Sequence, residues 1–473
     1  MAFFRRFLEL SIVVLAVIVL FCAPLPSGSV TQGWRHLFEG ISFLMLLLWV
    51  GLSLTSHSKP AIRLRNYFLP LIFVLICLLQ ILPMPGFLLG ILSGKSLALW
   101  SENARLLGYL GDESRRSFYT ISLYPNATWR ETLLVLSYCS FGFVIANHFR
   151  TRTRVLVLLT AVFLVSLLEA GSGLLQFIVA ARDQVGDAGM FSRGTYVNKN
   201  HFAGFLEMTV PLVLGYAVYL GNWMKGGGFS LKTLVATDNW GKQLIVLFLL
   251  GLMFLALLFS RSRTGILSVI LAIGFFYLCT LAVKSAAAEG GVRSSGFAVL
   301  LFLFVALSFG LWIGLYPVYE HFLRASGDAP GRLLVWKDTL RQVRDFPIFG
   351  SGLGTFRYVY PLYKHTMEQP TVYRYAHNDY LQLLSETGVA GFAVLIGALS
   401  LTLRSLIKRL LSADPEGGSL RVSIAIGAMT GVISILLHSF ADFNLHIPAN
   451  GLYFSFLIGI SYAMLFGKWE KVN

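Results

Sequence analysis

The chain is dominated by apolar stretches that are long enough to cross a lipid bilayer. A transmembrane helix needs ~20 consecutive, mostly apolar residues, and such runs recur along all 473 residues. The runs are continuous rather than alternating, which favours helices over a β-barrel. We therefore expect an all-α polytopic membrane protein with about twelve transmembrane helices. The expected spans are residues 7–24, 37–54, 67–83, 131–147, 155–180, 205–222, 243–260, 264–283, 297–315, 385–403, 422–438 and 450–467.

The positions of lysine and arginine predict how these spans are oriented. Cytoplasmic connections of membrane proteins carry an excess of Lys and Arg. If Arg5 and Arg6 lie inside, the even-numbered connections are cytoplasmic, and they are indeed short and basic. Both termini are then expected in the cytoplasm, and two long connections, 84–130 and 316–384, are external. Arginines in the remaining short external turns are not explained by orientation, so we expect them to bind an anionic group.

We expect three regions along the chain. The predicted organisation is a group of five N-terminal spans in residues 1–180, a catalytic membrane region in 181–451, and a last helix with a cytoplasmic tail in 452–473. The large external loop 316–384 precedes the tenth span.

Three arginines occupy two short external turns. Arg193 lies in a glycine- and asparagine-rich loop before a helix expected from about Phe202. Free N–H groups at a helix start, together with basic side chains, favour an anion. Arg261 and Arg263 lie in the turn SRSRTG, where they repel each other unless an anion binds them, and arginine suits bidentate phosphate recognition. The alternative for Arg193 is contact with lipid headgroups. The alternative for Arg261 and Arg263 is a structural role.

Residues 331–357 are expected to begin with an amphipathic helix that carries Arg332 on a polar face. Pro347 ends this helix, and the glycine-rich run GSGLG follows at 350–354. This run lacks the Lys-Ser/Thr of a nucleotide-binding loop and follows a helix, so it is a weak nucleotide motif. A lid or a helix at the membrane surface is the preferred interpretation.

The stretch RYAHNDYLQLLSETGVAG, residues 374–391, places a histidine just before an apolar span. A protonatable side chain is costly in such a setting unless it is paired or hydrated, so it is a functional-site hypothesis. His377 is expected to open a helix and share a face with Leu381, while Asp379 and Gln382 orient a sugar or the imidazole. A pKa near ~6.5 suits the imidazole to accept a proton from a hydroxyl. The alternative is a polar helix cap.

Near the last external turn, His438, Asp442 and His446 recur every four residues. On a continuous helix they would share a face, where they could ligate a metal. Pro448 and the Asn- and Gly-rich end of this segment indicate that the helix breaks, so we prefer Asp442 as the partner of an external arginine or histidine. No D-x-D pair or His/Cys cluster occurs, and neither a metal nor a cofactor is expected.

Five of these segments together resemble the O-antigen ligase/polymerase superfamily of bacterial inner-membrane glycosyltransferases. The matching pieces occur in family order within residues 182–451. They are the arginine loop before FAGFLEM, the SRSRTG turn, GRLLVW followed by PIFGSGLGTF, HNDYLQLLSETG, and HSFADFN. The resemblance implies a GT-C-like, metal-independent enzyme. It would move a glycan from undecaprenyl pyrophosphate onto an acceptor sugar hydroxyl at the periplasmic face.

The resemblance also implies roles for individual residues. Arg193 and Arg263 match the arginines that contact pyrophosphate in the family, His377 matches its catalytic histidine, and Asp442 its late acidic residue. We add Arg261 and Arg332 as further pyrophosphate-binding candidates and Asp379 as an orienting residue. With His377 as general base, a single displacement predicts inversion at the anomeric carbon.

Two acceptors and one other class of function remain open. A ligase transfers the glycan to lipid A–core, and a polymerase transfers it to the end of another lipid-linked glycan; we lean to the ligase type, in lipopolysaccharide or surface polysaccharide biosynthesis. A flippase or exporter would be expected to show internal repeats and midplane charges, whereas the polar groups here gather at one face. The expected partners are the lipid-linked donor, the acceptor and membrane lipids, with no nucleic acid.

Overall fold

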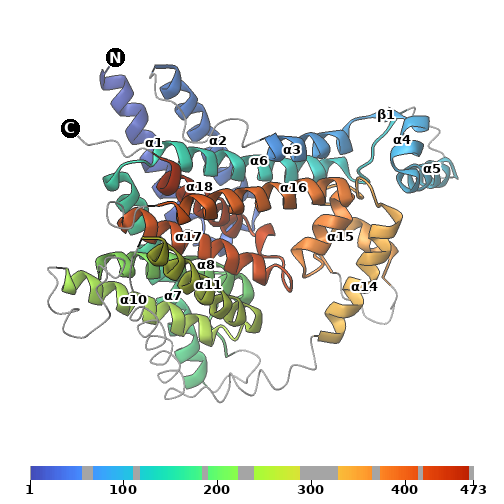
Figure 1. Cartoon of the computed structure of the whole chain (residues 1–473). Coiled ribbons are helices and arrows are strands. Elements are labelled where there is room, and N and C mark those ends of the chain that lie inside the picture. Colours follow the sequence, from blue (N-terminus) through green and yellow to red (C-terminus); the bar gives the residue numbers. More distant parts are fainter. Residues whose placement is uncertain are drawn as a thin grey trace.

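The computed structural model describes residues 2–55, 68–109, 118–183, 190–221, 239–287, 329–364, 373–413 and 419–467. In these ranges the chain is a bundle of long helices (Figure 1). Apart from the helices, the described residues form a single two-stranded antiparallel sheet, in which β1 (Met84–Pro85) pairs with β2 (Phe118–Tyr119). The α-helices are α1 (Ala2–Cys22), α2 (Gln32–Thr55), α3 (Phe68–Ile81), α4 (Gly86–Leu92), α5 (Gly94–Tyr109), α6 (Pro125–His148), α7 (Arg152–Arg182), α8 (Lys199–Leu220), α10 (Trp240–Phe259), α11 (Arg263–Ala287), α14 (Ala329–Asp345), α15 (Phe356–Val359), α16 (Asp379–Leu411), α17 (Ser419–His438) and α18 (Pro448–Phe466).

In the described ranges, eight helices are long and apolar enough to cross a membrane: α2, α7, α8, α10, α11, α16, α17 and α18. This confirms the expected all-α polytopic class. Of the other four expected spans, 7–24, 67–83 and 131–147 coincide with α1, α3 and α6. The span expected at 297–315 lies outside the described residues.

The bundle is built around α8, most of whose apolar length is buried. It packs chiefly against α17, and also against α10 and α11. Small residues allow α8 and α17 to approach closely: a Cβ on Gly427 would overlap the carbonyl of Pro211, and one on Gly431 would overlap that of Met208. In lipid, the hydrophobic effect does not drive helices together, so their association depends on close packing of this kind.

A break at Gly388 divides α16. Its backbone has φ 62° and ψ −173°, which is not helical. The N–H groups that the break releases are satisfied by the loop after α14, because Val389 donates to the carbonyl of Pro347 at 2.8 Å and Ala390 to that of Ile348 at 3.0 Å. A membrane helix tolerates such a break only where protein re-satisfies the backbone.

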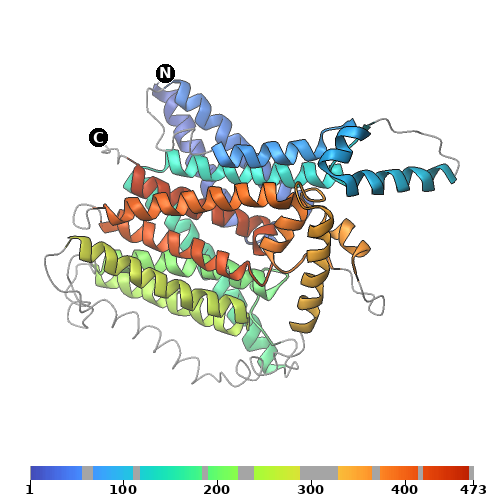
Figure 2. The ribbon, with the colours of Figure 1, turned by 45° about the vertical axis from the view of Figure 1, so that its right-hand side comes forward.

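The same loop also satisfies the carbonyls that precede the break. The N–H of Ser351 donates to the carbonyl of Ser385 at 3.1 Å, and the N–H of Gly352 donates to that of Glu386 at 3.0 Å. Figure 2 shows α14 crossing the ends of the long helices at this end of the bundle, with α5 projecting away from it. The broken helix and the glycine-rich loop therefore form one unit beneath α14.

Candidate functional site

The candidate site lies at the end of the bundle where α8 and α16 begin and α17 ends. The N–H of Asp379, the first residue of α16, donates to the carbonyls of Ser439 at 2.9 Å and Asp442 at 3.2 Å. From the start of α8, the Asn200 amide donates to Oδ2 of Asp442 at 2.6 Å. The turn after α17 thus joins the N-termini of two other helices.

His377 precedes α16 rather than opening it. Its φ is +51°, and Asn378 is the N-cap, accepting a hydrogen bond from the N–H of Leu381 at 3.0 Å. Our expectation that His377 and Leu381 share a helical face is therefore wrong. Asparagine is a stronger N-cap than histidine, so the helix begins one residue after the cap and the histidine lies in the turn before it. A non-glycine residue in this left-handed region is strained and occurs mainly where the surroundings require it.

Asp442 is shared by two imidazoles. Its Oδ1 lies 3.5 Å from Nδ1 of His377 and 3.9 Å from Nε2 of His201, and the carboxylate is fully buried. The His377 side chain is 29% exposed, and its ring meets Phe443 edge-on at 4.8 Å. Burial raises the pKa of Asp442, but the contact with His377 and the charges of His201 and His438 outweigh it and hold the pKa well below its ordinary value. Asp442 therefore stays ionised and can stabilise a protonated His377.

Helix α14 donates hydrogen bonds to the turn that carries Asp442 and to the residue before His377. Nη1 of Arg332 donates to the carbonyl of Ala441 at 2.7 Å, next to Asp442. One turn further along, Nε1 of Trp336 donates to the carbonyl of Ala376 at 3.0 Å. Arg332 is thus brought to the site, but the contact it makes is with the backbone of the turn that carries Asp442.

The SRSRTG turn joins α10 to α11 beside the start of α8. Arg261 has φ +54° and is 2% exposed, and Arg263 is the first residue of α11. A Cβ on Gly265 would lie 2.9 Å from Cβ of Ala203 and 3.4 Å from Oε2 of Glu207. The first turn of α11 therefore packs directly on the first turns of α8, which also carry His201.

The loop before α8 reaches the same end of the bundle. The N–H of Ser192 donates to the carbonyl of Phe259, the last residue of α10, at 2.8 Å. Arg193 follows and is exposed, while the ammonium of Lys199 lies 5.2 Å from the centre of the Phe191 ring. Helix α8 begins at Lys199 with Asn198 as its cap, slightly earlier than expected. The arginines of both turns thus gather near the helix start that carries His201.

The three side chains spaced four residues apart, His438, Asp442 and His446, each have a different partner. Nδ1 of His438 lies 3.1 Å from both carboxylate oxygens of Glu207, with both side chains fully buried. His446 lies 2.7 Å from Oδ1 of Asp379, while Asp442 faces His377. The part of the chain that the structure describes contains no group of three or more His, Cys, Asp or Glu side chains arranged to hold a metal. Since α17 ends at His438, the four-residue spacing no longer aligns these side chains.

Asp379 orients an imidazole, but it is that of His446 and not that of His377. Its Oδ2 also accepts hydrogen bonds from Oγ of Ser439 at 2.8 Å and from the N–H of Leu445 at 3.2 Å. Burial lowers the pKa of His446, but the hydrogen bond and charge of Asp379 outweigh it and raise the pKa to about 9. The His446–Asp379 pair therefore ties the start of α16 to the segment before α18, a role that the sequence spacing did not reveal.

The glycine-rich loop binds a carboxylate of the protein itself. The N–H of Gly354 donates to Oε2 of Glu386 at 2.8 Å and the N–H of Phe356 donates to Oε1 at 3.1 Å. Nε2 of Gln382 also reaches Oε1 at 3.2 Å. The N–H groups that would cradle a phosphate in a nucleotide loop are thus occupied, and Glu386 is a site residue that sequence reasoning missed.

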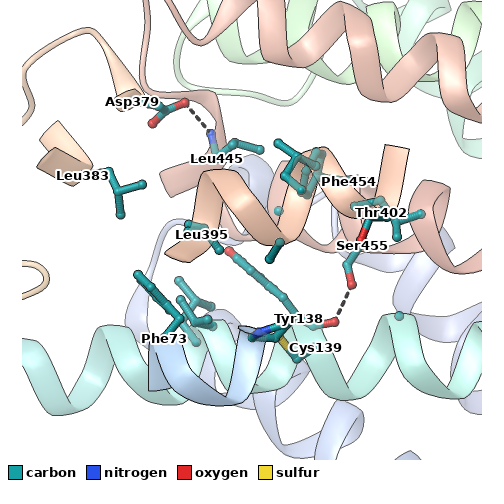
Figure 3. Close-up of a pocket in the computed structure, with 18 of the residues that line it drawn as sticks. Phe73, Tyr138, Cys139, Asp379, Leu383, Leu395, Thr402, Leu445, Phe454 and Ser455 are labelled. Atoms are coloured by element: carbon teal, nitrogen blue, oxygen red, sulfur yellow. Dashed lines mark hydrogen bonds between the residues drawn. The ribbon is translucent and has the colours of Figure 1, made fainter. Parts of the chain in front are cut away.

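An elongated cavity of about 310 Å³ adjoins the site on the side of α3, α6, α16 and α18 (Figure 3). Its lining is mostly apolar. Its polar end is formed by Glu131, Asp379, Glu386 and His446.

Comparison with known proteins identifies one family. Residues 248–396 match the family model described as O-Antigen ligase. The matched segment contains Arg261, Arg263, Arg332 and His377, whereas Arg193 and Asp442 lie outside it. No curated protein matches the chain.

Proposed function

We propose, on the premise that this chain belongs to the O-antigen ligase/polymerase superfamily, that it transfers a glycan from undecaprenyl pyrophosphate to an acceptor sugar hydroxyl. The reaction would take place at the periplasmic face of the bacterial inner membrane. One observation carries the proposal: a partly exposed histidine, His377, lies 3.5 Å from the buried carboxylate of Asp442, at the end of the bundle that also holds the SRSRTG arginines.

His377 acts as the general base. Because Nδ1 faces Asp442, Nε2 accepts the proton of the acceptor hydroxyl as its oxygen bonds to the anomeric carbon. The bond from that carbon to the pyrophosphate oxygen breaks, and its electron pair leaves with the pyrophosphate. Asp442 stabilises the imidazolium in the way a buried carboxylate does in a catalytic triad, and general-base catalysis of this kind contributes typically ~10²–10⁴-fold. A single displacement inverts the anomeric centre.

The arginines stabilise the leaving group. Arg261 is 2% exposed, so its charge acts in surroundings of low dielectric constant, where attraction to a phosphate is strong. Arg263 shares the turn and provides a second guanidinium, while the exposed Arg193 meets the pyrophosphate at the entrance. Arg332 supports the turn that carries Asp442. These guanidinium groups supply positive charge where other glycosyltransferases use a metal, so the proposed reaction needs none.

A transfer assay with purified protein tests this function. A defined undecaprenyl-pyrophosphate oligosaccharide is incubated in EDTA, with lipid A–core in one tube and with no other acceptor in the second. Product on lipid A–core identifies the ligase reaction, and lengthened donor glycan identifies the polymerase reaction.

Three variants make the assay specific. His377→Ala and Arg263→Ala are expected to lower kcat by roughly 10²-fold or more. Arg404→Ala, an exposed arginine near the other end of α16, should retain wild-type activity. If wild-type protein gives no transfer in either tube, but moves the donor across liposomes, the enzyme proposal is wrong and the flippase is favoured.

A further inference from the structure

Ala376, the residue before His377, is held at both of its backbone polar groups by side chains. Its carbonyl accepts a hydrogen bond from Nε1 of Trp336 at 3.0 Å, and its N–H donates to Oε1 of Gln382 at 3.0 Å. Ala376 is fully buried, so bulk water cannot replace either partner. The chain that leads into His377 is therefore fixed by one side chain from α14 and one from α16.

The neighbours of Gln382 fix the orientation of its amide. The N–H of Ala376 can only donate, so the amide oxygen faces it, and the amide nitrogen donates to Oε1 of Glu386 at 3.2 Å. His446 lies 3.1 Å from the same nitrogen, but its ring can donate or accept and so does not set the orientation. A rotated amide would place a donor against Ala376 and an acceptor against Glu386. The buried Gln382 side chain therefore has one favourable arrangement.

Glu386 is held in turn by the glycine-rich loop. One carboxylate oxygen accepts a hydrogen bond from the N–H of Gly354 at 2.8 Å, and the other accepts one from the N–H of Phe356 at 3.1 Å. Hydrogen bonds from a backbone N–H to a carboxylate are stronger than those between neutral groups. A continuous series of hydrogen bonds thus runs from the loop through Glu386 and Gln382 to Ala376.

This series ends beside a strained residue. His377 has φ +51°, and a residue other than glycine keeps that conformation only where its surroundings hold it. The side of the turn that follows His377 is held by the N–H of Asp379, which donates to the carbonyls of Ser439 and Asp442. The side that precedes it is held through Ala376. A displacement of ~1 Å can lower a rate by ~10²-fold, so the position of the imidazole relative to Asp442 depends on both sides.

We propose that Gln382 and Glu386 are positioning residues for the general base, and that the glycine-rich loop is their support. They hold Ala376 and, through it, the turn that directs Nδ1 of His377 towards Asp442. This inference rests on the proposed glycan transfer, in which His377 is the base. Gln382 thus acts on the imidazole through the backbone, and not by the direct contact that the sequence suggested.

Gln382→Leu removes the acceptor of the Ala376 N–H and keeps a side chain of similar volume. In the transfer assay we expect kcat to fall roughly tenfold or more and the donor KM to stay within about twofold of wild type, because the pyrophosphate-binding arginines are not touched. Melting temperatures in detergent establish the temperature at which each variant is folded.

Gln80→Leu is the matched control. It also replaces a buried glutamine, and the hydrogen bonds of Gln80 go to the same loop and to the backbone of α16 rather than to Ala376. This variant should lose stability but keep the wild-type kcat at a temperature where it is folded. The comparison separates a loss of positioning from a general loosening of the loop.

Exchange of the two side chains provides a rescue. Gln382→Glu alone keeps an acceptor for Ala376 but places two carboxylates against each other, so kcat should fall. In the double variant, Gln382→Glu with Glu386→Gln, the new amide donates to the new carboxylate, and its oxygen can still accept from the N–H of Gly354. We expect the double variant to have a kcat roughly tenfold above that of Gln382→Glu. This pair also decides the question if Gln382→Leu does not fold.

Carbethoxylation by diethyl pyrocarbonate, followed by mass spectrometry, probes the turn without any transfer. The His377 side chain is 29% exposed, and a loosened turn should make it react several-fold faster in Gln382→Leu. His36, whose side chain is 53% exposed, is the internal reference and should react at the same rate in all variants. Gln80→Leu should change neither rate.

An unchanged kcat in Gln382→Leu, or an equal loss of kcat in Gln80→Leu, overturns the inference. A double variant that is no more active than Gln382→Glu also overturns it, as does an unchanged rate of carbethoxylation at His377. If wild-type protein transfers no glycan, the proposed function itself is wrong. The carbethoxylation rates then still decide whether Gln382 and Glu386 hold the turn at His377.

Discussion

Gly388→Ala is expected to destabilise the protein by several kcal/mol, because two separate costs arise at this position. With φ 62° and ψ −173°, Gly388 occupies a region that is essentially restricted to glycine, and a side chain there costs of order 1–3 kcal/mol. A Cβ would also overlap the carbonyl of Ile348 and lie 2.6 Å from the N–H nitrogen of Gly350, so the loop must withdraw.

The second cost is the loss of backbone hydrogen bonds. The withdrawal breaks the bonds from Val389 and Ala390 to the loop, each worth ~0.5–1.5 kcal/mol. With the strain, the sum is about 2–6 kcal/mol. Because the same loop holds Glu386 and packs beneath α14, transfer activity should fall together with stability.

The assay is thermal unfolding in detergent, followed by transfer at a temperature where both proteins remain folded. Gly397→Ala is the control, since it lies in the same helix and its added Cβ would meet only Leu69, at 3.9 Å. This control should be neutral or slightly stabilising, because alanine is favoured over glycine inside a helix by about 1 kcal/mol. Equal melting temperatures for wild type and Gly388→Ala would refute the reasoning that α16 is broken and braced at this residue.

Three further predictions follow from individual contacts. His446 has a pKa raised from ~6.5 to about 9, so its pairing with Asp379 stabilises the fold fully below pH ~6.5, and this stabilisation is lost as the pH rises through 9. Between pH 7 and pH 10 the melting temperature should therefore fall further in wild type than in His446→Gln. The difference corresponds to a free energy of unfolding of up to about 3 kcal/mol. Asp442→Asn should lower kcat by ~10²-fold or more with little change in the donor KM, and an unchanged kcat contradicts its role beside His377. Gln80→Leu removes three hydrogen bonds to the 349–354 loop and to α16 and should destabilise by about 2–4 kcal/mol, measured by chemical unfolding; a change below 1 kcal/mol would show that the loop docks without it.

Hydropathy alone was enough to predict the eight helices of the described residues that are long and apolar enough to cross a membrane. A spanning helix satisfies its own backbone, so an apolar run of sufficient length determines the element with little help from its neighbours. The break in α16 could not be predicted in this way, because the expected span at 385–403 runs through Gly388 and hydropathy gives no sign of a break there. The break depends on the loop at 347–352, about forty residues earlier in the chain, whose carbonyls accept the released N–H groups.

The sequence singled out His377 and favoured Asp442 as the partner of an external arginine or histidine, but it did not predict the partner of Asp379. Asp379 was expected to orient a sugar or that imidazole because it is two residues away, yet the Asn378 cap turns the chain so that Asp379 faces His446 and His377 faces Asp442. Such pairings depend on how the turn after α17 packs against α16. The sequence also did not predict that Glu386 binds the glycine-rich loop. This carboxylate comes from another helix, and no feature of the sequence near the loop indicates it.

The buried pair between Glu207 and His438 has a consequence for how the protein enters the membrane. The two residues are 231 positions apart in the chain, which at ~5–20 residues per second means that roughly 12–46 s of synthesis separate them. An ionisable side chain without a partner is costly within a transmembrane helix, so Glu207 leaves α8 poorly suited to lipid during that interval. We infer that α8 stays at the translocation machinery, or in contact with α10 and α11, until α17 arrives, and that the central helix of the mature bundle is among the last to settle.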